Sequence, residues 1–290
     1  MSENRRLFSN CACRFFLSAL LLLCGGAASA QQPQMVLDHG GSTIVLEPYA
    51  PNIIRVSLSL IKNQATAPAS YGFVGTPDAD GWTQQQSEQG ETYRSARMVV
   101  TIAARHPGKP TATQVDIGKF FNGSTPGAHI TFRTPEGKTL LDMADWSMSV
   151  PNYKDGNAGV LNSRRATDPP FYQVGASFVS PDDEHYYGLG QNQEGFLDHR
   201  GHTVNCWHNY TATAAPSVCV PFMVTNYGYG IVWDNPSKTT IEPGFNEQTR
   251  WTSEVGQRVS FFVIAGATLD EIYAGYRQLT GATPLLPKAA

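Results

Sequence analysis

Apolar residues recur at every second position over most of the chain between residues 31 and 266. In residues 54–60, isoleucine, valine and leucine alternate with arginine and serine. Successive side chains of a strand point to opposite faces, so this alternation is typical of a strand with one face on a core and one in water. Residues 54–60 are therefore predicted to form a half-buried strand.

The same pattern recurs along the chain between clusters of turn-forming residues. The other predicted strands include residues 42–46, 98–103, 129–134, 172–179, 218–225, 230–233 and 258–265. Glycine, proline, aspartate and asparagine gather between them, for example in residues 77–81 and 180–183. Many short strands joined by such turns predict an all-β fold, a large antiparallel β-sandwich that occupies residues 31–266 as one domain.

The period changes near residue 268, where a helix is predicted. Thr268 and Glu271 match the capping box of a helix N-terminus, and Gly281 suits the residue after the last turn. The apolar residues that share one face of this helix are Leu269, Ile272, Tyr273, Tyr276 and Leu279. One helix is expected to follow the sandwich, and residues 267–290 are interpreted as a linker helix with its continuation.

The first 30 residues have the pattern of a secretory signal peptide. Arg5 and Arg6 precede an apolar stretch at residues 15–23, and Ala28 and Ala30 frame a small-residue cleavage site. The apolar stretch is far shorter than the ~20 residues that a membrane-spanning helix needs. Cleavage after Ala30 would export the protein to the periplasm or the extracellular space, with no membrane anchor in the mature chain.

Composition and charge narrow the range of ligands. Of the 290 residues, 41% are hydrophobic and 16% are charged, which excludes a disordered chain and permits a large core. The formal net charge is −3, and the chain has no run of lysine or arginine. We therefore expect no nucleic-acid partner and no anionic membrane partner, and we expect neutral or weakly charged ligands.

Two cysteines, Cys206 and Cys219, remain after the predicted signal peptide. In an oxidising compartment they could form a disulfide across neighbouring strands, and two buried free thiols fit the sequence as well. Cys206 would share one strand face with His202 and His208, but the spacing around Gly201 matches no metal-binding motif. No metal and no other cofactor is expected.

The densest group of polar and aromatic residues lies between residues 186 and 210. Glu194 and Asp198 are the carboxylates of this segment, and both are expected in loops, where carboxylates are usually solvated. Hydrolysis of a glycosidic bond needs two acids on opposite sides of the bond, one protonated and one charged. The segment does not supply a clear pair, so no catalytic residue is predicted.

The same segment has the residue types that bind sugars. Pyranose rings stack on flat aromatic faces, and amide and guanidinium groups can satisfy several hydroxyl groups at once. Side chains of these kinds are Gln191, Asn192, Arg200, Trp207, Asn209 and Tyr210. The alternative for any one of them is a structural role, with Trp207 in the core or Arg200 in an ion pair.

Three motifs of the chain resemble glycoside hydrolase family 31, which includes α-glucosidases and α-xylosidases. They are residues 187–193 (YGLGQNQ) together with Arg200 and Gly201, residues 220–222 (VPF), and residues 228–236 (GYGIVWDNP). The resemblance extends over residues 35–287 and implies a galactose-mutarotase-like β-sandwich ahead of a (β/α)8 barrel. Residues 281–284 resemble the entry into that barrel.

The resemblance also implies where catalysis occurs. The catalytic aspartates of the family reside in the barrel, and the chain ends where the barrel is expected, so we expect a truncated or split product that is inactive alone. A downstream (β/α)8 catalytic domain and an oligosaccharide or α-glycoside are the expected partners. The sandwich loop that borders the barrel mouth corresponds to Asn209, Tyr210 and Thr211, which adds Thr211 to the expected sugar-binding residues.

Two other functions fit the same fold. A free-standing mutarotase-like epimerase needs an acid and a base around an anomeric oxygen, for which His208 with Glu242 or Glu247 can be imagined. A lectin-like exported protein needs only a surface that binds sugars.

Overall fold

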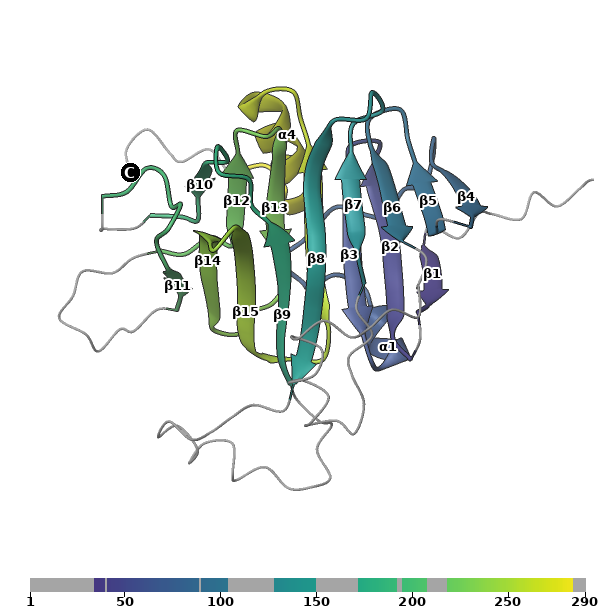
Figure 1. The fold of residues 1–290 in the computed structure, drawn as a ribbon, viewed down its shortest axis with the longest axis horizontal. Helices are drawn as coiled ribbons and strands as arrows, with labels where there is room; N and C mark the ends of the chain where they lie inside the picture. Colours follow the sequence, from purple (N-terminus) through teal and green to yellow (C-terminus); the bar gives the residue numbers. More distant parts are fainter. Residues whose placement is uncertain are drawn as a thin grey trace, which may run out of the picture. The chain divides into compact units, whose positions relative to one another are not determined.

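The computed structural model describes residues 34–39, 41–88, 90–103, 128–149, 172–191, 195–207 and 218–283. Within these ranges the chain forms two antiparallel β-sheets and two helices (Figure 1). The all-β sandwich predicted from the sequence is confirmed. No helix in these ranges is long and apolar enough to cross a membrane.

The first sheet has seven strands and collects its members from both ends of the described chain. In order across the sheet they are β1 (Met35–Asp38), β2 (Thr43–Ala50), β3 (Ile53–Ser59), β16 (Val259–Ala265), β13 (Tyr229–Trp233), β12 (Phe222–Thr225) and β10 (Tyr186–Gly188). The central pairing joins β3 to β16, so this sheet forms only when segments about 200 residues apart in the sequence meet.

The second sheet has nine strands, and most of them are neighbours in the sequence as well as in space. In order they are β11 (Val204–Cys206), β14 (Thr239–Phe245), β15 (Gln248–Gly256), β9 (Tyr172–Val179), β8 (Thr139–Ser149), β7 (Ile130–Arg133), β6 (Val99–Ala103), β5 (Gly90–Arg94) and β4 (Thr83–Ser87).

The two sheets face each other across the main hydrophobic core, whose middle is aromatic. Trp233 of β13 stacks on Trp251 of β15 at a ring-centroid distance of 5.5 Å and on Phe261 of β16 at 6.0 Å. The Trp233 Nε1–H donates to Ser253 Oγ at 2.8 Å, so the polar atom of this buried ring keeps a partner. Packing of this kind fixes how the sheets face one another.

The outer face of the seven-stranded sheet is covered by α4 (Leu269–Thr280). Ile272 and Leu279 of the helix are buried in a second cluster with Phe262 of β16 and Phe222 of β12. The Tyr276 ring stacks on Phe222 at a centroid distance of 4.2 Å. The apolar face of the helix therefore packs on the sandwich itself.

The predicted capping of α4 is confirmed. The Thr268 hydroxyl accepts a hydrogen bond from the Glu271 N–H at 3.3 Å, and Gly281 follows the last turn with φ = 91°. The predicted apolar face is wrong at two positions, because Leu269 and Tyr273 are 50% and 48% exposed. These side chains lie at the margin of the buried stripe of the helix.

The prediction that residues 54–60 form a half-buried strand is wrong. β3 is buried on both faces, and its polar residues Arg55, Ser57 and Ser59 are at most 1% exposed. The reason is the covering of the outer face of this sheet, here by α1 (Lys62–Ala65) and the segment after it. Alternation marked the two faces of the strand correctly, but it did not show that the polar face is also covered.

Arg55 is fully buried beside acceptor groups of the strand β2 and of the segment after α1. Its Nε donates to Glu47 Oε2 at 2.7 Å, and its Nη2 donates to the Ala67 carbonyl oxygen at 2.9 Å. Its Nη1 lies 3.9 Å from Asp234 Oδ2, and Asp234 also pairs with Arg258 at 3.4 Å. Two arginines and two carboxylates thus neutralise each other, as buried charges require. The cluster fastens the segment after α1 to the sheet.

Candidate functional site

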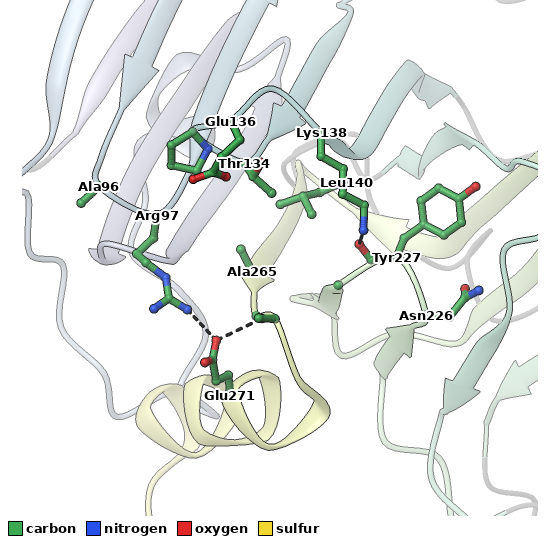
Figure 2. A pocket seen from close by; sticks show the side chains of 14 residues that line it. Ala96, Arg97, Thr134, Glu136, Lys138, Leu140, Asn226, Tyr227, Ala265 and Glu271 are labelled. Atoms are coloured by element: carbon green, nitrogen blue, oxygen red, sulfur yellow. Dashed lines mark hydrogen bonds and ion pairs between the residues drawn. The ribbon is translucent and has the colours of Figure 1, made fainter.

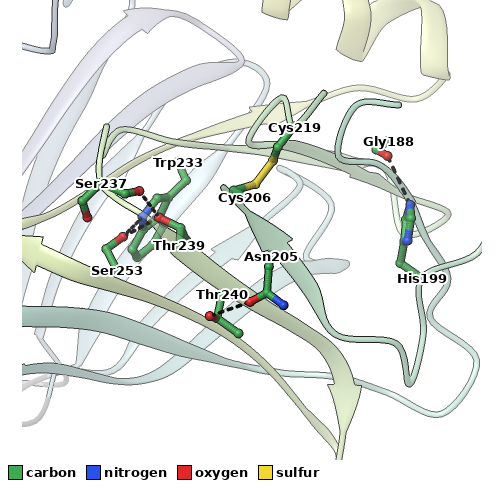
Figure 3. The surroundings of a disulfide bond; sticks show 10 residues. All are labelled: Gly188, His199, Asn205, Cys206, Cys219, Trp233, Ser237, Thr239, Thr240 and Ser253. Carbon is green, nitrogen blue, oxygen red and sulfur yellow. Dashed lines mark hydrogen bonds between the residues drawn. A yellow bond between two sulfur atoms is a disulfide. The ribbon is translucent and has the colours of Figure 1, made fainter. Parts of the chain in front are cut away.

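The predicted sugar-binding segment lies where the two sheets reach their edges. β10 is an edge strand of the seven-stranded sheet, and β11 is an edge strand of the nine-stranded sheet. A disulfide joins Cys206 of β11 to Cys219, which lies just before β12, with 5.1 Å between the two Cα atoms (Figure 3). The sequence left the state of these cysteines open, and the structure pairs them. The bond holds the edges of the two sheets together. Because Cys206 is in a disulfide, it has no free thiolate that could bind a metal ion.

A backbone bridge next to the disulfide brings in Gln191. The N–H groups of Gln191 and Val218 each donate to the carbonyl oxygen of the other residue, at 2.7 and 2.9 Å. Val218 precedes Cys219, and Trp207 follows Cys206. The name disulfide rim is used below for Gln191, Cys206, Trp207, Val218 and Cys219. Two predicted sugar-binding residues, Gln191 and Trp207, thus lie in one neighbourhood.

Trp207 is the tryptophan of the disulfide rim, and it is 58% exposed. The other tryptophans of the chain are at most 3% exposed, namely Trp82, Trp146, Trp233 and Trp251. The alternative that Trp207 belongs to the core is therefore wrong. An exposed indole ring on a tethered edge is available to stack on a ligand ring.

Arg200 takes the structural role that the sequence left as its alternative. Its Nη1 donates to Ser180 Oγ and to the Glu184 carbonyl oxygen, each at 2.9 Å, and its Nη2 lies 3.6 Å from an oxygen of Asp182. Its stem packs on Gly244, where a Cβ atom would come within 2.7 Å of Arg200 Cγ. The guanidinium group is directed at the protein and does not join the disulfide rim.

The remaining predicted site residues lie outside the described residues. They are Asn209, Tyr210 and Thr211, together with Asn192, Glu194 and His208. Of the residues considered for an epimerase, the structure therefore describes only the two acids. Glu242 lies on β14, and Glu247 lies in the turn after this strand. Among the described residues no group of three or more His, Cys, Asp or Glu side chains is arranged to hold a metal ion.

Asp198 is held as a carboxylate by its surroundings. Burial by itself raises its pKa, but the N–H groups of Tyr186 and Arg200 and the side chain of His185 bring the pKa below its ordinary value. His185 Nδ1 lies 2.6 Å from Asp198 Oδ2. A carboxylate with a lowered pKa is a poor proton donor near neutral pH, and the contacts of Asp198 with His185 and Tyr186 fasten the loop to the start of β10.

A buried carboxyl group, Glu184, was not singled out from the sequence. It is 1% exposed, and its Oε2 lies 2.7 Å from the Tyr186 hydroxyl oxygen. Burial raises the pKa of Glu184, while hydrogen bonds from Tyr186 and Tyr229 act in the opposite direction. Its sequence context, an acidic turn before β10, gives no signal of burial. Because Glu184 is buried and accepts a hydrogen bond from Tyr186, it belongs to the polar core.

An apolar groove of about 250 Å³ adjoins the disulfide rim. Val220 and Pro221, which follow Cys219 in the sequence, line this groove together with Tyr71, Phe73 and Tyr276. Tyr71 is 96% exposed.

A larger cleft of about 460 Å³ lies at the N-terminal end of α4 (Figure 2). It contains two carboxylates, Glu136 and Glu271. Hydrogen bonds from the Thr134 side chain and from its own backbone lower the pKa of Glu136, and the Ala267 N–H and then Arg97 lower that of Glu271. A glycosidase acid requires a raised pKa in one member of a pair, so these two groups do not form such a pair.

The two packed antiparallel sheets define a β-sandwich module, and comparison with known proteins gives its family. Residues 43–242 match the family described as "Glycosyl hydrolase 31 N-terminal galactose mutarotase-like domain". This match covers more than half of the chain. The chain therefore belongs to the family of N-terminal galactose mutarotase-like domains of glycosyl hydrolase family 31.

Curated relatives agree with this assignment. The chain is similar to an alpha-xylosidase from Saccharolobus solfataricus, with 34% identity over an alignment of 177 residues that covers 53% of this chain and 23% of that protein. It is also similar to the alpha-xylosidase XylQ from Lactiplantibacillus pentosus, with 32% identity over 36% of this chain and 14% of that protein. The chain thus spans less than a quarter of the length of these relatives.

Solved structures share the fold at lower sequence identity. A GH31 alpha-xylosidase from Xanthomonas citri superposes with a TM-score of 0.67 and 16% identity, over 88% of this chain and 40% of that chain. A GH31 alpha-xylosidase from a soil metagenome, complexed with xylose, gives a TM-score of 0.63 and 21% identity over 88% of this chain and 34% of that chain.

Proposed function

We propose that this chain is the carbohydrate-binding β-sandwich of an exported family 31 α-glycosidase of the α-xylosidase or α-glucosidase type. In this proposal, bond cleavage occurs in a (β/α)8 catalytic domain that follows the sandwich in the whole enzyme. The observation that carries the proposal is the family match over residues 43–242. The names of the relatives, which are alpha-xylosidases, support an α-glycoside as the ligand.

The disulfide rim supports the binding part of the proposal. Trp207 offers an exposed aromatic face beside a covalently fixed edge, and the adjoining groove adds aromatic and apolar surface. A fixed site loses less conformational entropy when a ligand binds than a mobile one does. The expected contact is a pyranose ring stacked on the indole, with hydroxyl groups toward Gln191 and the predicted residues Asn209, Tyr210 and Thr211.

The export part of the proposal draws on the leader pattern and on the disulfide. Disulfides persist mainly in oxidising compartments, which include the periplasm and the extracellular space. Mass spectrometry of the exported protein should give a mature chain that begins at Gln31. A mature chain that keeps residues 1–30 would contradict cleavage after Ala30.

Tryptophan fluorescence tests sugar binding at the disulfide rim. Titration with isomaltotriose or maltotriose is expected to change the emission, and Trp207→Phe should abolish the change, because the other tryptophans are buried. Trp82→Phe is the matched control and should keep the response. Binding at the rim is contradicted if Trp207→Phe leaves the response intact. Glycerol at equal concentration checks for a solvent effect.

A further inference from the structure

The cleft at the N-terminal end of α4 is separate from the disulfide rim and shares no lining residue with it. Its walls come from four connections: residues 96–97 before β6, residues 134–138 between β7 and β8, residues 226–228 between β12 and β13, and residues 265–271 leading into α4 (Figure 2). At about 460 Å³ it falls within the ~300–1,000 Å³ that small-molecule sites usually occupy.

The cleft is open because the residues along it are small. Ala96, Ala265 and Ala267 line it, together with Gly228 and Gly266. The Gly266 N–H donates to the Gly228 carbonyl oxygen at 3.0 Å, and Gly228 has φ = 91°, which favours glycine. Leu140 also lines the cleft, but it is only 5% exposed, and the exposed apolar side chains along the cleft are Ala96 and Ala267.

The polar groups of the cleft are held in place before any ligand arrives. Arg97 Nη2 lies 2.5 Å from Glu271 Oε2, which also accepts from the Ala267 N–H at 3.0 Å. Lys138 Nζ donates to the Tyr227 carbonyl oxygen at 3.0 Å and lies 5.8 Å from the centroid of the Tyr227 ring. Preorganised groups lower the entropy cost of binding.

The charges of the cleft favour a neutral ligand. Two basic groups, Arg97 and Lys138, are balanced by two carboxylates, Glu136 and Glu271. The side chains of Arg97 and Glu271 are 50% and 42% exposed, so both keep contact with solvent and can reach a ligand. A balanced set of strong donors and acceptors matches hydroxyl groups, which both donate and accept, better than it matches an anion or a cation.

We propose that this cleft is a second carbohydrate site, which binds a neutral sugar unit through Arg97, Glu271 and Lys138. The site rests on the proposed function, because it takes the same class of ligand as the disulfide rim. This second binding surface lies at the end of the sandwich where α4 begins.

Calorimetric titration of the whole chain with isomaltotriose and maltotriose tests the site. Trp207→Ala is made first, so that heat from the rim is removed and the remaining binding can be measured. In this background Arg97→Gln should weaken that binding by about tenfold, the effect of losing one charge-assisted hydrogen bond. Ala96→Trp, at an exposed lining position, should abolish it by filling the cleft. Arg250→Gln is the matched control and should have no effect, because Arg250 is an exposed arginine outside the cleft.

The outcomes separate this inference from the proposed function. The cleft site is overturned if binding is unchanged in both Ala96→Trp and Arg97→Gln. It is also overturned if Trp207→Ala alone abolishes all binding. Neither result contradicts sugar binding at the disulfide rim. No heat with either sugar in the unmodified chain overturns sugar binding altogether. Thermal unfolding of each variant confirms that it is folded, and the two cleft variants disturb different contacts.

Discussion

At the scale of single residues, the most informative side chains are those that the fold uses differently from what their type predicts. Arg200 is a sugar-binding type of residue, but its guanidinium group binds Ser180 and the Glu184 carbonyl oxygen. Trp207 is a core type of residue, but it is exposed. Residue type therefore indicates what a side chain can do, and its neighbours decide what it does.

Asp234 gives the sharpest prediction at this scale. Asp234→Ala should lower the free energy of unfolding by about 3–5 kcal/mol, because it leaves the buried Arg55 and Arg258 without one of their carboxylates. Urea denaturation measures the change. Lys238→Ala, which breaks the exposed pair with Glu254, should cost less than about 1 kcal/mol. Equal losses in the two variants would show that the buried cluster is not a stabilising unit.

At the scale of elements, the disulfide is the link that joins the edge strand β11 to the segment entering β12. It closes a loop between residues 13 positions apart in the sequence. These residues flank the predicted rim loop at Asn209, Tyr210 and Thr211. The cross-link therefore stabilises the edge of the sandwich and fixes the distance between the two ends of the predicted rim loop.

Removal of the disulfide is predicted to destabilise the chain. The double variant Cys206→Ser with Cys219→Ser should lose about 3 kcal/mol, because a loop of 13 residues gains entropy in the unfolded state. Differential scanning calorimetry with and without dithiothreitol measures the change. Reductant should lower the Tm of the unmodified chain and leave the double variant unaffected. A reductant effect of the same size in both would place its cause elsewhere.

At the scale of the whole molecule, the sandwich and α4 form one packed body within the described residues, because Ile272 and Leu279 complete the cover of the outer sheet face. The hollows described here do not offer the pair of acids that a glycosidase uses. Asp198, Glu136 and Glu271 all have pKa values below their ordinary values.

The corresponding prediction is that the purified chain hydrolyses neither 4-nitrophenyl α-xyloside nor 4-nitrophenyl α-glucoside above the uncatalysed rate. Release of 4-nitrophenol measures it, and an intact family 31 α-xylosidase serves as the positive control for the assay. A rate that Asp198→Asn or Glu194→Gln abolishes would contradict the proposal. It would place the acids of catalysis in this chain.

The sequence by itself determined the elements with strong local signals. The alternation in residues 54–60 and the apolar run at residues 258–265 predicted the strands that the structure shows as β3 and β16, and the pair Thr268 and Glu271 predicted the start of α4. Several strands were not singled out from the sequence, and one of them, β4 (Thr83–Ser87), is exposed at every position and so has no apolar alternation. Local sequence patterns indicate the backbone geometry of an element and the burial of one of its faces, because both depend on residues close together in the sequence.

Only the tertiary structure decided which predicted residues meet. The second covered face of β3, the burial of Glu184, the pairing of Cys206 with Cys219 and the turn of Arg200 toward Ser180 depend on contacts between distant segments. The spacing of residues in the sequence does not indicate such contacts. Motifs determined the family, and the packing of two sheets and one helix decided which side chains remain available to a ligand.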